Sequence, residues 1–137
     1  MTKIVTKYLG DLRTEAEHLQ SGNKILTDAP LDNQGKGEYF SATDLLATSL
    51  GSCILTIMGI SAKNHGFSID GAWIETEKVM SAQPPRRVAK LILDIHLPRN
   101  NYSEKEIKLI EAAVAHCPVG LSLHPDVEKQ ITLHYGT

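Results

Sequence analysis

The sequence predicts an α+β protein, in which strands and helices occur in separate groups instead of alternating one by one. Two observations predict this class. Short strand-like runs divided by turn signals fill the first 28 residues, and a long apolar segment with helical spacing follows from Ser41. Two more strand-like segments, a second helical segment and a last strand complete the order β-β-β-α-β-β-α-β.

Three short strands are expected before the first helix. Their bounds are Lys3–Leu9, Leu12–Leu19 and Lys24–Thr27. Gly10-Asp11 and Gly22-Asn23 separate them, and such glycine-containing pairs are typical of tight turns. A polar, glycine-rich loop then covers Ala29–Glu38.

The clearest helix is predicted to begin at Ser41. Ser41 and Asp44 have the spacing of a capping box, in which each side chain accepts from the other residue's backbone N–H. Apolar residues such as Leu46 and Leu50 then recur at helical spacing, so we expect a helix that is buried over much of its surface. It should end near Asn64–Gly66, whose glycine can adopt the left-handed conformation that closes helices.

A long hairpin is expected next, followed by a second helix. Phe67–Ser81 and Val88–Leu97 have strand character, and Gln83–Arg86 contains two prolines that separate them. Ser103 and Glu106 form a second capping-box pattern, which opens a helix ending near His116-Cys117. The remaining expected elements are a helical turn over Val119–Leu123 and a last strand over Val127–Tyr135.

Length and composition are those of one domain over residues 1–137. A chain of 137 residues buries roughly two-thirds of the surface that its unfolded form exposes, so it needs neither disulfides nor a structural metal to form a core. Hydrophobic residues make up 42% of the chain, which argues against disorder. The net charge of −2 and the lack of a basic run argue against a nucleic-acid partner.

Neither a membrane partner nor an export signal is expected. The apolar stretch Leu45–Ile60 is interrupted by Thr48, Ser49, Gly51 and Ser52, and we expect it to be too polar to span a bilayer. The N-terminal segment MTKIVTKYLGDLRTE shows no signal-sequence pattern. The expected location is the cytoplasm, where cysteines are more often free or catalytic than bridged.

The two cysteines stand 64 residues apart and form no Cys-x-x-Cys motif. Cys117 precedes Pro118, and proline favours the first position of a helix, so Cys117 should be an N-cap residue whose thiolate is stabilised by backbone N–H groups. The alternative is a small apolar residue at a helix junction. Cys53 lies within the apolar helix, where it either fills the core or needs a cation from elsewhere to become reactive.

Three segments together resemble the OsmC/Ohr family. They read SATDLLATSLGSC over residues 41–53, HCPVGLSL over residues 116–123 and SGNKILTDAP over residues 21–30. The first is similar to the family's helix motif with its cysteine, and the second to its cysteine–proline motif. The likeness extends over almost the whole chain in order and spacing.

The resemblance implies an OsmC-like fold, with antiparallel sheets packed around long central helices in a domain-swapped homodimer. It implies reduction of organic hydroperoxides, or of hydrogen peroxide, through a sulfenate on Cys53 and then a Cys53–Cys117 disulfide. Arg13 best matches the arginine that the family places beside the reactive thiol. A dithiol reductant of the lipoyl or thioredoxin type would restore the thiols, without a metal or bound organic cofactor.

The sequence departs from the family pattern at two positions. Thr43 stands where many peroxide-reducing members have a glutamate, and Ala42 replaces the usual proline. Asp44, the nearest acid on the helix, is interpreted as a capping residue. Two other functions therefore stay open: an OsmC-like protein that binds a small apolar or electrophilic ligand without efficient turnover, and an interaction module with inert cysteines.

The six histidines show no zinc-ligand spacing beside a cysteine pair, so no metal site is expected. His18 and His116 are the two expected nearest the thiols, each as a hydrogen-bonding group.

Overall fold

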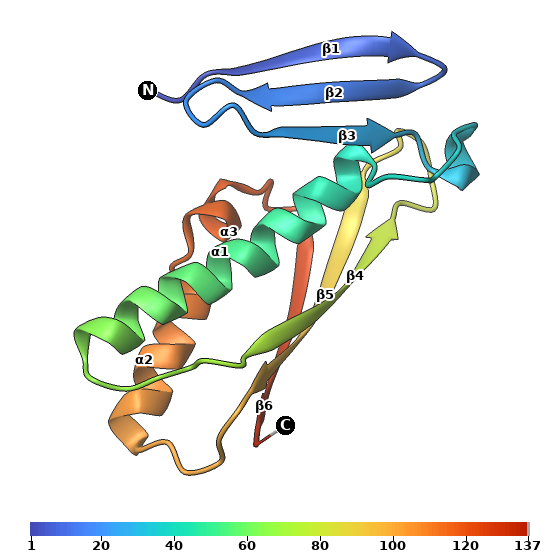
Figure 1. The fold of residues 1–137 in the computed structure, drawn as a ribbon. Helices are drawn as coiled ribbons and strands as arrows, with labels where there is room; N and C mark the ends of the chain where they lie inside the picture. Colours follow the sequence, from blue (N-terminus) through green and yellow to red (C-terminus); the bar gives the residue numbers. More distant parts are fainter. Residues whose placement is uncertain (137) are drawn as a thin grey trace. The chain divides into compact units, whose positions relative to one another are not determined.

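The computed structural model describes residues 1–136 and has the predicted order of strands and long helices (Figure 1). Its elements are β1 (Ile4–Gly10), β2 (Arg13–His18), β3 (Lys24–Asp28), the 3-10 turn η1 (Leu31–Asn33), α1 (Ala42–Asn64), β4 (Trp73–Met80), β5 (Val88–Leu97), α2 (Glu104–Ala115), α3 (Pro118–Ser122) and β6 (Glu128–Tyr135). The chain forms two compact units, residues 1–46 and the residues from 47 onward, which are described in turn.

The first unit is built on an antiparallel sheet with the order β1-β2-β3. Asp11 and Leu12 both have positive φ in the turn between β1 and β2, one residue later than the predicted Gly10-Asp11 pair. Positive φ at two successive residues gives a turn whose twist matches that of the flanking strands. The Leu12 N–H donates to the Tyr8 hydroxyl at 3.2 Å, which ties this turn to β1.

The two faces of this sheet differ in character. Side chains alternate along a strand, and the register places Ile4, Tyr8 and Ile25 on one face, together with His18 and with small and hydroxyl side chains. These three side chains are half or more exposed. The opposite face carries charged residues, including Glu15 and Arg13. The face with Ile4, Tyr8 and Ile25 therefore carries several exposed apolar side chains.

The start and end of α1 follow the sequence signals. The Asp44 N–H donates to the Ser41 hydroxyl at 3.0 Å, and the Ser41 N–H donates to an Asp44 carboxylate oxygen at 2.9 Å. This confirms the predicted capping box and the structural role of Asp44. After Asn64 the chain turns through Gly66, whose φ is +75°, as expected for the residue that closes a helix.

The sequence-based expectation that Leu45–Ile60 is too polar to span a bilayer was wrong as far as length and composition are concerned. Among the helices of residues 1–136, α1 is long and apolar enough to cross a membrane. A core helix of a folded domain passes the same test. Leu50, Ile54 and Met58 are almost fully buried in the hydrophobic core, so one face of this helix is a core face.

The second unit contains a mixed sheet with the order β4-β5-β6. β4 and β5 form the predicted hairpin, but β6 pairs with β5 in parallel, with Leu91 opposite Lys129. The expectation of purely antiparallel sheets is therefore wrong for β6. The reason is the connection: α2 and α3 carry the chain back across the sheet, and such a crossover lets the next strand run parallel.

The strand predicted over Phe67–Ser81 is shorter than expected, because β4 begins only at Trp73. A turn precedes it, in which the Ala72 N–H donates to the Ile69 carbonyl at 2.9 Å and Gly71 has a φ of +96°. The Ser68 carbonyl accepts a bond from the Tyr102 hydroxyl at 3.0 Å. With these backbone groups bonded elsewhere, the segment does not extend the sheet.

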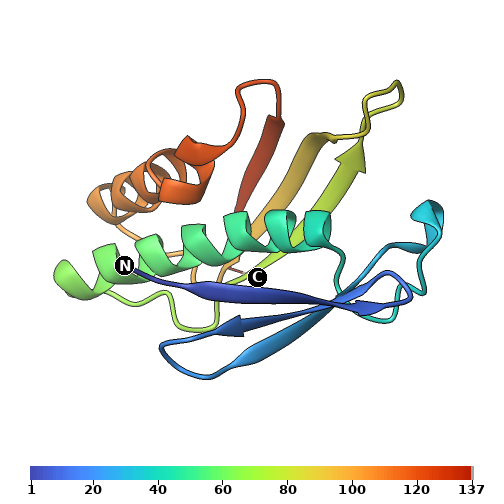
Figure 2. The same ribbon diagram turned by 90° about the horizontal axis from the view of Figure 1, so that it is seen from above.

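The core of the second unit lies on one face of its sheet. The alternating residues of β5 that point inward are fully buried: Leu91, Leu93, Ile95 and Leu97. They belong to one cluster with the buried residues of α1 and with Ile110 and Ala113 of α2, so both helices cover this face (Figures 1 and 2). The Ser103–Glu106 capping box that opens α2 is present with both of its hydrogen bonds.

Candidate functional site: a dithiol pair and an arginine–carboxylate cluster

The second unit brings together two cysteines that are distant in sequence. Cys53 lies on α1 and packs against the core, and Cys117 lies at the junction of α2 and α3. Both are free thiols, and they are close enough that Cys53 affects the ionisation of Cys117. Cys117 is buried with 1% of its surface exposed, whereas Cys53 is only partly buried. The pair is therefore asymmetric, with one partly exposed cysteine and one enclosed cysteine.

The local sequence around Cys117 explains how its sulfur is held. Cys117 is the N-cap residue of α3 and Pro118 follows at the first helical position, as the sequence predicts. The Gly120 N–H donates to the Cys117 Sγ at 3.2 Å. A Cβ atom at position 120 would lie 3.1 Å from that sulfur, so glycine permits the close approach of the backbone.

Burial raises the pKa of the Cys117 thiol. The Gly120 N–H and the charge of Lys129 act in the opposite direction, and the neighbouring Cys53 adds to the rise. The backbone donor expected from the sequence is present and favours the thiolate, but desolvation of the enclosed sulfur is the larger effect, so the net shift of the pKa is upward. At neutral pH Cys117 is held as the neutral thiol.

Lys129 is a part of this site that the sequence analysis did not identify. Its Nζ donates to the Gly120 carbonyl at 3.1 Å, so Gly120 bonds the Cys117 sulfur on one side and the ammonium on the other. The alternation of side chains along β6 could have identified it from the sequence. Lys129 has the same parity as Ile131 and Leu133, which pack against the core, so a lysine occupies an inward position at the start of that strand.

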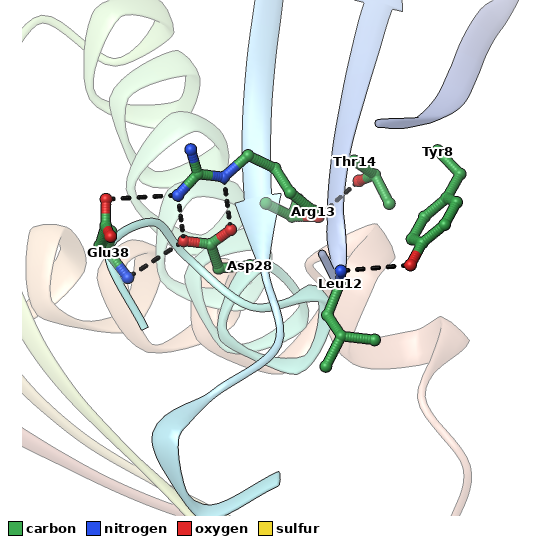
Figure 3. Close-up of polar contacts among 7 residues, drawn as sticks. Tyr8, Leu12, Arg13, Thr14, Asp28 and Glu38 are labelled. Carbon is green, nitrogen blue, oxygen red and sulfur yellow. Dashed lines mark hydrogen bonds and ion pairs between the residues drawn. The ribbon is translucent and has the colours of Figure 1, made fainter. Parts of the chain in front are cut away.

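The first unit contains a second cluster, centred on Arg13. Arg13 and Asp28 are direct cross-strand partners on β2 and β3. The Arg13 Nε donates to Asp28 Oδ1 at 2.7 Å and Nη2 donates to Oδ2 at 2.9 Å, while Nη2 also donates to Glu38 Oε2 at 3.3 Å (Figure 3). The guanidinium carbon lies 4.7 Å from the centre of the Tyr39 ring. Arg13 is therefore held from three sides.

The ion pair fixes the charges of both partners. Hydrogen bonding to Arg13 holds the pKa of the Asp28 carboxyl below its usual range, although burial opposes this shift. The bond to Asp28 likewise raises the pKa of the Arg13 guanidinium further above its already high value. The Glu38 N–H donates to Asp28 Oδ2 at 3.1 Å and completes the enclosure of that carboxylate.

Sequence reasoning selected Arg13 but missed both of its acidic partners. Asp28 was noted only within a family segment, and Glu38 only as the end of a polar loop. The turn between β2 and β3, in which Gly22 has a φ of +78°, sets the register that places Asp28 opposite Arg13. Arg13 belongs to the first unit and Cys53 to the second, and the approach of the guanidinium to a thiol stays a prediction.

The two histidines expected near the thiols make local hydrogen bonds. The His18 Nδ1 bonds the Ser21 hydroxyl at 2.6 Å, and the His116 Nδ1 bonds the Ala112 carbonyl at 2.9 Å. Within residues 1–136, no group of three or more His, Cys, Asp or Glu side chains is placed to hold a metal ion.

Fold and site together define a class: an α+β protein with a paired cysteine on a long core helix and a Cys-Pro junction. The sequence pattern of the OsmC-like protein family matches residues 35–132, and the chain belongs to this family. No protein among those with curated functions matches it.

Solved structures agree with this assignment. A candidate osmotic stress induced and detoxification response protein from Psychrobacter arcticus 273-4 is 49% identical, with 98% of this chain and 96% of that chain covered and a TM-score of 0.91. An OsmC-like protein from Mycoplasma pneumoniae is 18% identical, with 100% and 98% covered and a TM-score of 0.81. An organic hydroperoxide resistance protein OsmC from Legionella pneumophila is 16% identical, with 97% and 96% covered and a TM-score of 0.75. The last two show a shared fold.

Proposed function

We propose that this protein is a thiol-dependent peroxidase that reduces organic hydroperoxides, and hydrogen peroxide as a second substrate. The observation that carries the proposal is the neighbouring pair of free cysteines, one partly exposed and one enclosed. The name of the Legionella relative, organic hydroperoxide resistance protein, agrees with this chemistry. We place the activity in the cytoplasm, where the cysteines start each cycle as thiols.

The proposed reaction has two chemical steps at sulfur. The Cys53 thiolate attacks one peroxide oxygen; the O–O bond breaks, an S–O bond forms, and the leaving alkoxide takes up a proton to become an alcohol. Cys53 is thereby oxidised by two electrons to a sulfenic acid. Cys117, as thiolate, then attacks the sulfenic sulfur, forms the disulfide and releases hydroxide, which is protonated to water.

A dithiol reductant of the lipoyl or thioredoxin type closes the cycle. Its first thiolate attacks the protein disulfide and releases one protein thiolate. Its second thiolate then attacks the mixed disulfide, releases the other protein thiolate and leaves the reductant as its own disulfide. Neither step calls for a metal or a bound organic cofactor.

Arg13 is proposed as the cation that favours the thiolate form of Cys53, since a nearby opposite charge stabilises an ionised group. Asp28 would then position the guanidinium through its two bonds. Arg13→Ala should slow alkylation of Cys53 near neutral pH. An unchanged alkylation rate would remove Arg13 from the site.

Steady-state turnover is the direct test of the proposed activity. Cumene hydroperoxide, tert-butyl hydroperoxide and hydrogen peroxide are each supplied with dihydrolipoamide, thioredoxin or glutathione. Cys53→Ser should abolish both peroxide consumption and sulfenate trapping, whereas Cys117→Ser should leave a trappable sulfenate. A reversal of these two results would exchange the roles of the cysteines, and no turnover with any pair would contradict the proposal.

The active form is proposed to be a domain-swapped homodimer. Ile4, Tyr8 and Ile25 are exposed apolar side chains on one face of the first sheet, and a three-stranded sheet with such a face gains stability when another surface covers it. A second copy of the chain would provide that surface, and the exchange would bring Arg13 to the partner's thiol site.

Mixed dimers test this arrangement. Arg13→Ala and Cys53→Ser subunits, each inactive alone, are unfolded together and refolded. In a swapped dimer one of the two sites contains both native residues, so activity should reappear. No recovery, or a mass in solution of 15.0 kDa, would rule out a shared site.

A second candidate function is binding of a small apolar or electrophilic ligand without efficient turnover. It is favoured by the engagement of Arg13 with two carboxylates and by Thr43 at the position of the family's glutamate. Stoichiometric labelling of Cys53 by a mild thiol reagent, combined with no peroxide consumption, would select this function over the peroxidase.

A further inference from the structure

Lys129 is the cation that the second unit itself places beside the dithiol pair. Its Nζ lies 3.8 Å from the position of a Cβ atom at residue 120, and the Cys117 sulfur lies 3.1 Å from the same point. The ammonium and the sulfur are therefore at most 6.9 Å apart, the sum of these two distances. At this separation a unit charge acts appreciably on the ionisation of a partly desolvated group.

The ammonium is held in this place by its neighbours. Lys129 takes an inward position at the start of β6, opposite Leu91 of β5, whose side chain is fully buried. The bond from Nζ to the Gly120 carbonyl directs the charged end toward α3 while the residue as a whole stays exposed. The lysine stem thus covers the sheet and its head reaches the residue that also bonds the sulfur.

A nearby cation would help Cys117 to ionise. An enclosed sulfur is costly to ionise, yet it must be a thiolate to attack an oxidised Cys53. The groups that act most strongly on this sulfur include Cys53 from α1 and Lys129 from β6, together with the Gly120 N–H as a neutral donor. Of these, Lys129 alone brings a positive charge.

We propose that Lys129 is a positioning residue for disulfide closure, whose ammonium stabilises the attacking thiolate of Cys117. The inference rests on the proposed Cys53–Cys117 disulfide step and assigns a residue to it. In that step the Cys117 thiolate forms a bond to the Cys53 sulfur and displaces the group bound there. The proposal assigns Lys129 to this closure step and not to the attack of Cys53 on the oxidant, so its effect should be confined to closure.

Closure can be followed without any peroxide. The reduced protein is mixed with dithiobisnitrobenzoate, which reacts first with the more accessible Cys53 and releases one thionitrobenzoate. The Cys117 thiolate then attacks the mixed disulfide, forms the Cys53–Cys117 disulfide and releases a second thionitrobenzoate. The two absorbance phases report the two sulfurs separately, and Cys117→Ser, which should retain only the first phase, identifies them.

Lys129→Met keeps the apolar stem and removes the charge. We expect its second phase to be about two- to fivefold slower near neutral pH, since an increase in thiolate basicity partly compensates for a smaller thiolate fraction. The first phase should be unchanged. The difference should vanish at alkaline pH, where Cys117 is ionised in both proteins. Lys129→Arg should restore the rate, and Lys105→Met, which removes a charge from the first turn of α2, should match the native protein.

An unchanged second phase in Lys129→Met would overturn the inference, as would the absence of a second phase in the native protein. Equal slowing of both phases, or slowing that persists at alkaline pH, would show a structural effect and would also overturn it. The proposed peroxidase activity is judged separately. If native closure depends on Lys129 but no hydroperoxide is consumed, the peroxidase proposal fails and the role of Lys129 stands.

Discussion

The arginine–carboxylate cluster and the dithiol pair have opposite effects on their ionisable groups: the first favours the charged form and the second the neutral form. In the first unit, Arg13 and Asp28 are fully charged, because each has a partner of opposite sign at hydrogen-bond distance. In the second unit, burial dominates and the Cys117 sulfur is held neutral, although Lys129 lies nearby. The comparison shows that a charge in direct contact decides ionisation, whereas a charge several ångströms away only moderates the effect of burial.

The same difference appears in how each cluster is supported. The residues of the arginine cluster are positioned by the pairing of β2 with β3, in a sheet that carries exposed apolar side chains on its other face. The dithiol stands on the hydrophobic core, where Leu50 is 1% exposed and comes within 3.5 Å of the position of a Cβ at residue 120. Packing changes should therefore disturb the dithiol more, and pH changes should disturb the arginine cluster more.

The largest effect is expected from Leu50→Ala, which leaves a cavity beneath Gly120 and the dithiol. Loss of a buried leucine side chain should reduce the free energy of unfolding by about 2–5 kcal/mol, measured by urea denaturation of the reduced protein. Leu121→Ala, at a 69% exposed position in α3, is the matched control and should change it by less than about 0.5 kcal/mol. Similar losses in both variants would contradict the core-supported view of the site.

Next in size is Asp28→Asn, which removes the carboxylate from the Arg13 pair. A carboxyl with a lowered folded-state pKa contributes stability that is complete above its ordinary pKa of about 4 and is lost as pH falls through the folded value. The native protein should therefore lose stability below about pH 4, and the variant should lose less over the same interval. Urea midpoints measured from neutral to strongly acidic pH check this. Parallel pH profiles would show that Asp28 does not couple to folding.

A smaller effect is expected from Gly120→Ala. The added Cβ would lie 3.1 Å from the Cys117 sulfur, so the sulfur must shift, and closure of the disulfide should slow in the two-phase thiol assay. Gly59→Ala is the control, because a Cβ there meets nothing within 4 Å inside α1. That variant should be stabilised by about 0.5–1 kcal/mol and should close at the native rate. Equal closure rates in both variants would remove the argument for glycine at position 120.

The smallest effect is expected from Glu38→Gln. Its carboxylate is 61% exposed and makes a single 3.3 Å contact with Arg13, so the exposed pair should contribute about 0–1 kcal/mol to the free energy of unfolding. The contribution should shrink further at high salt. An effect as large as that of Asp28→Asn would mean that the two acids hold Arg13 equally. This would contradict the geometry, in which Arg13 makes two hydrogen bonds to Asp28 and one to Glu38.

Local sequence determined much of the fold correctly. The capping boxes at Ser41 and Ser103, the closing Gly66 and the N-cap position of Cys117 are all confirmed. Each depends on residues within a few positions of one another, so their backbone and side-chain groups meet whatever the rest of the chain does. The Arg13 partners were missed because they lie 15 and 25 residues away.

By itself, the sequence determined the order of strands and helices, the helix ends, and a cysteine pair that identifies the family. Only the tertiary structure decided that β6 runs parallel to β5, that Asp28 faces Arg13, and that Lys129 reaches Gly120. It also decided the direction of the Cys117 pKa, since the backbone donor is local whereas the desolvation comes from residues of several elements. Interactions along the chain are encoded by spacing, but register and burial exist only once distant segments have packed together.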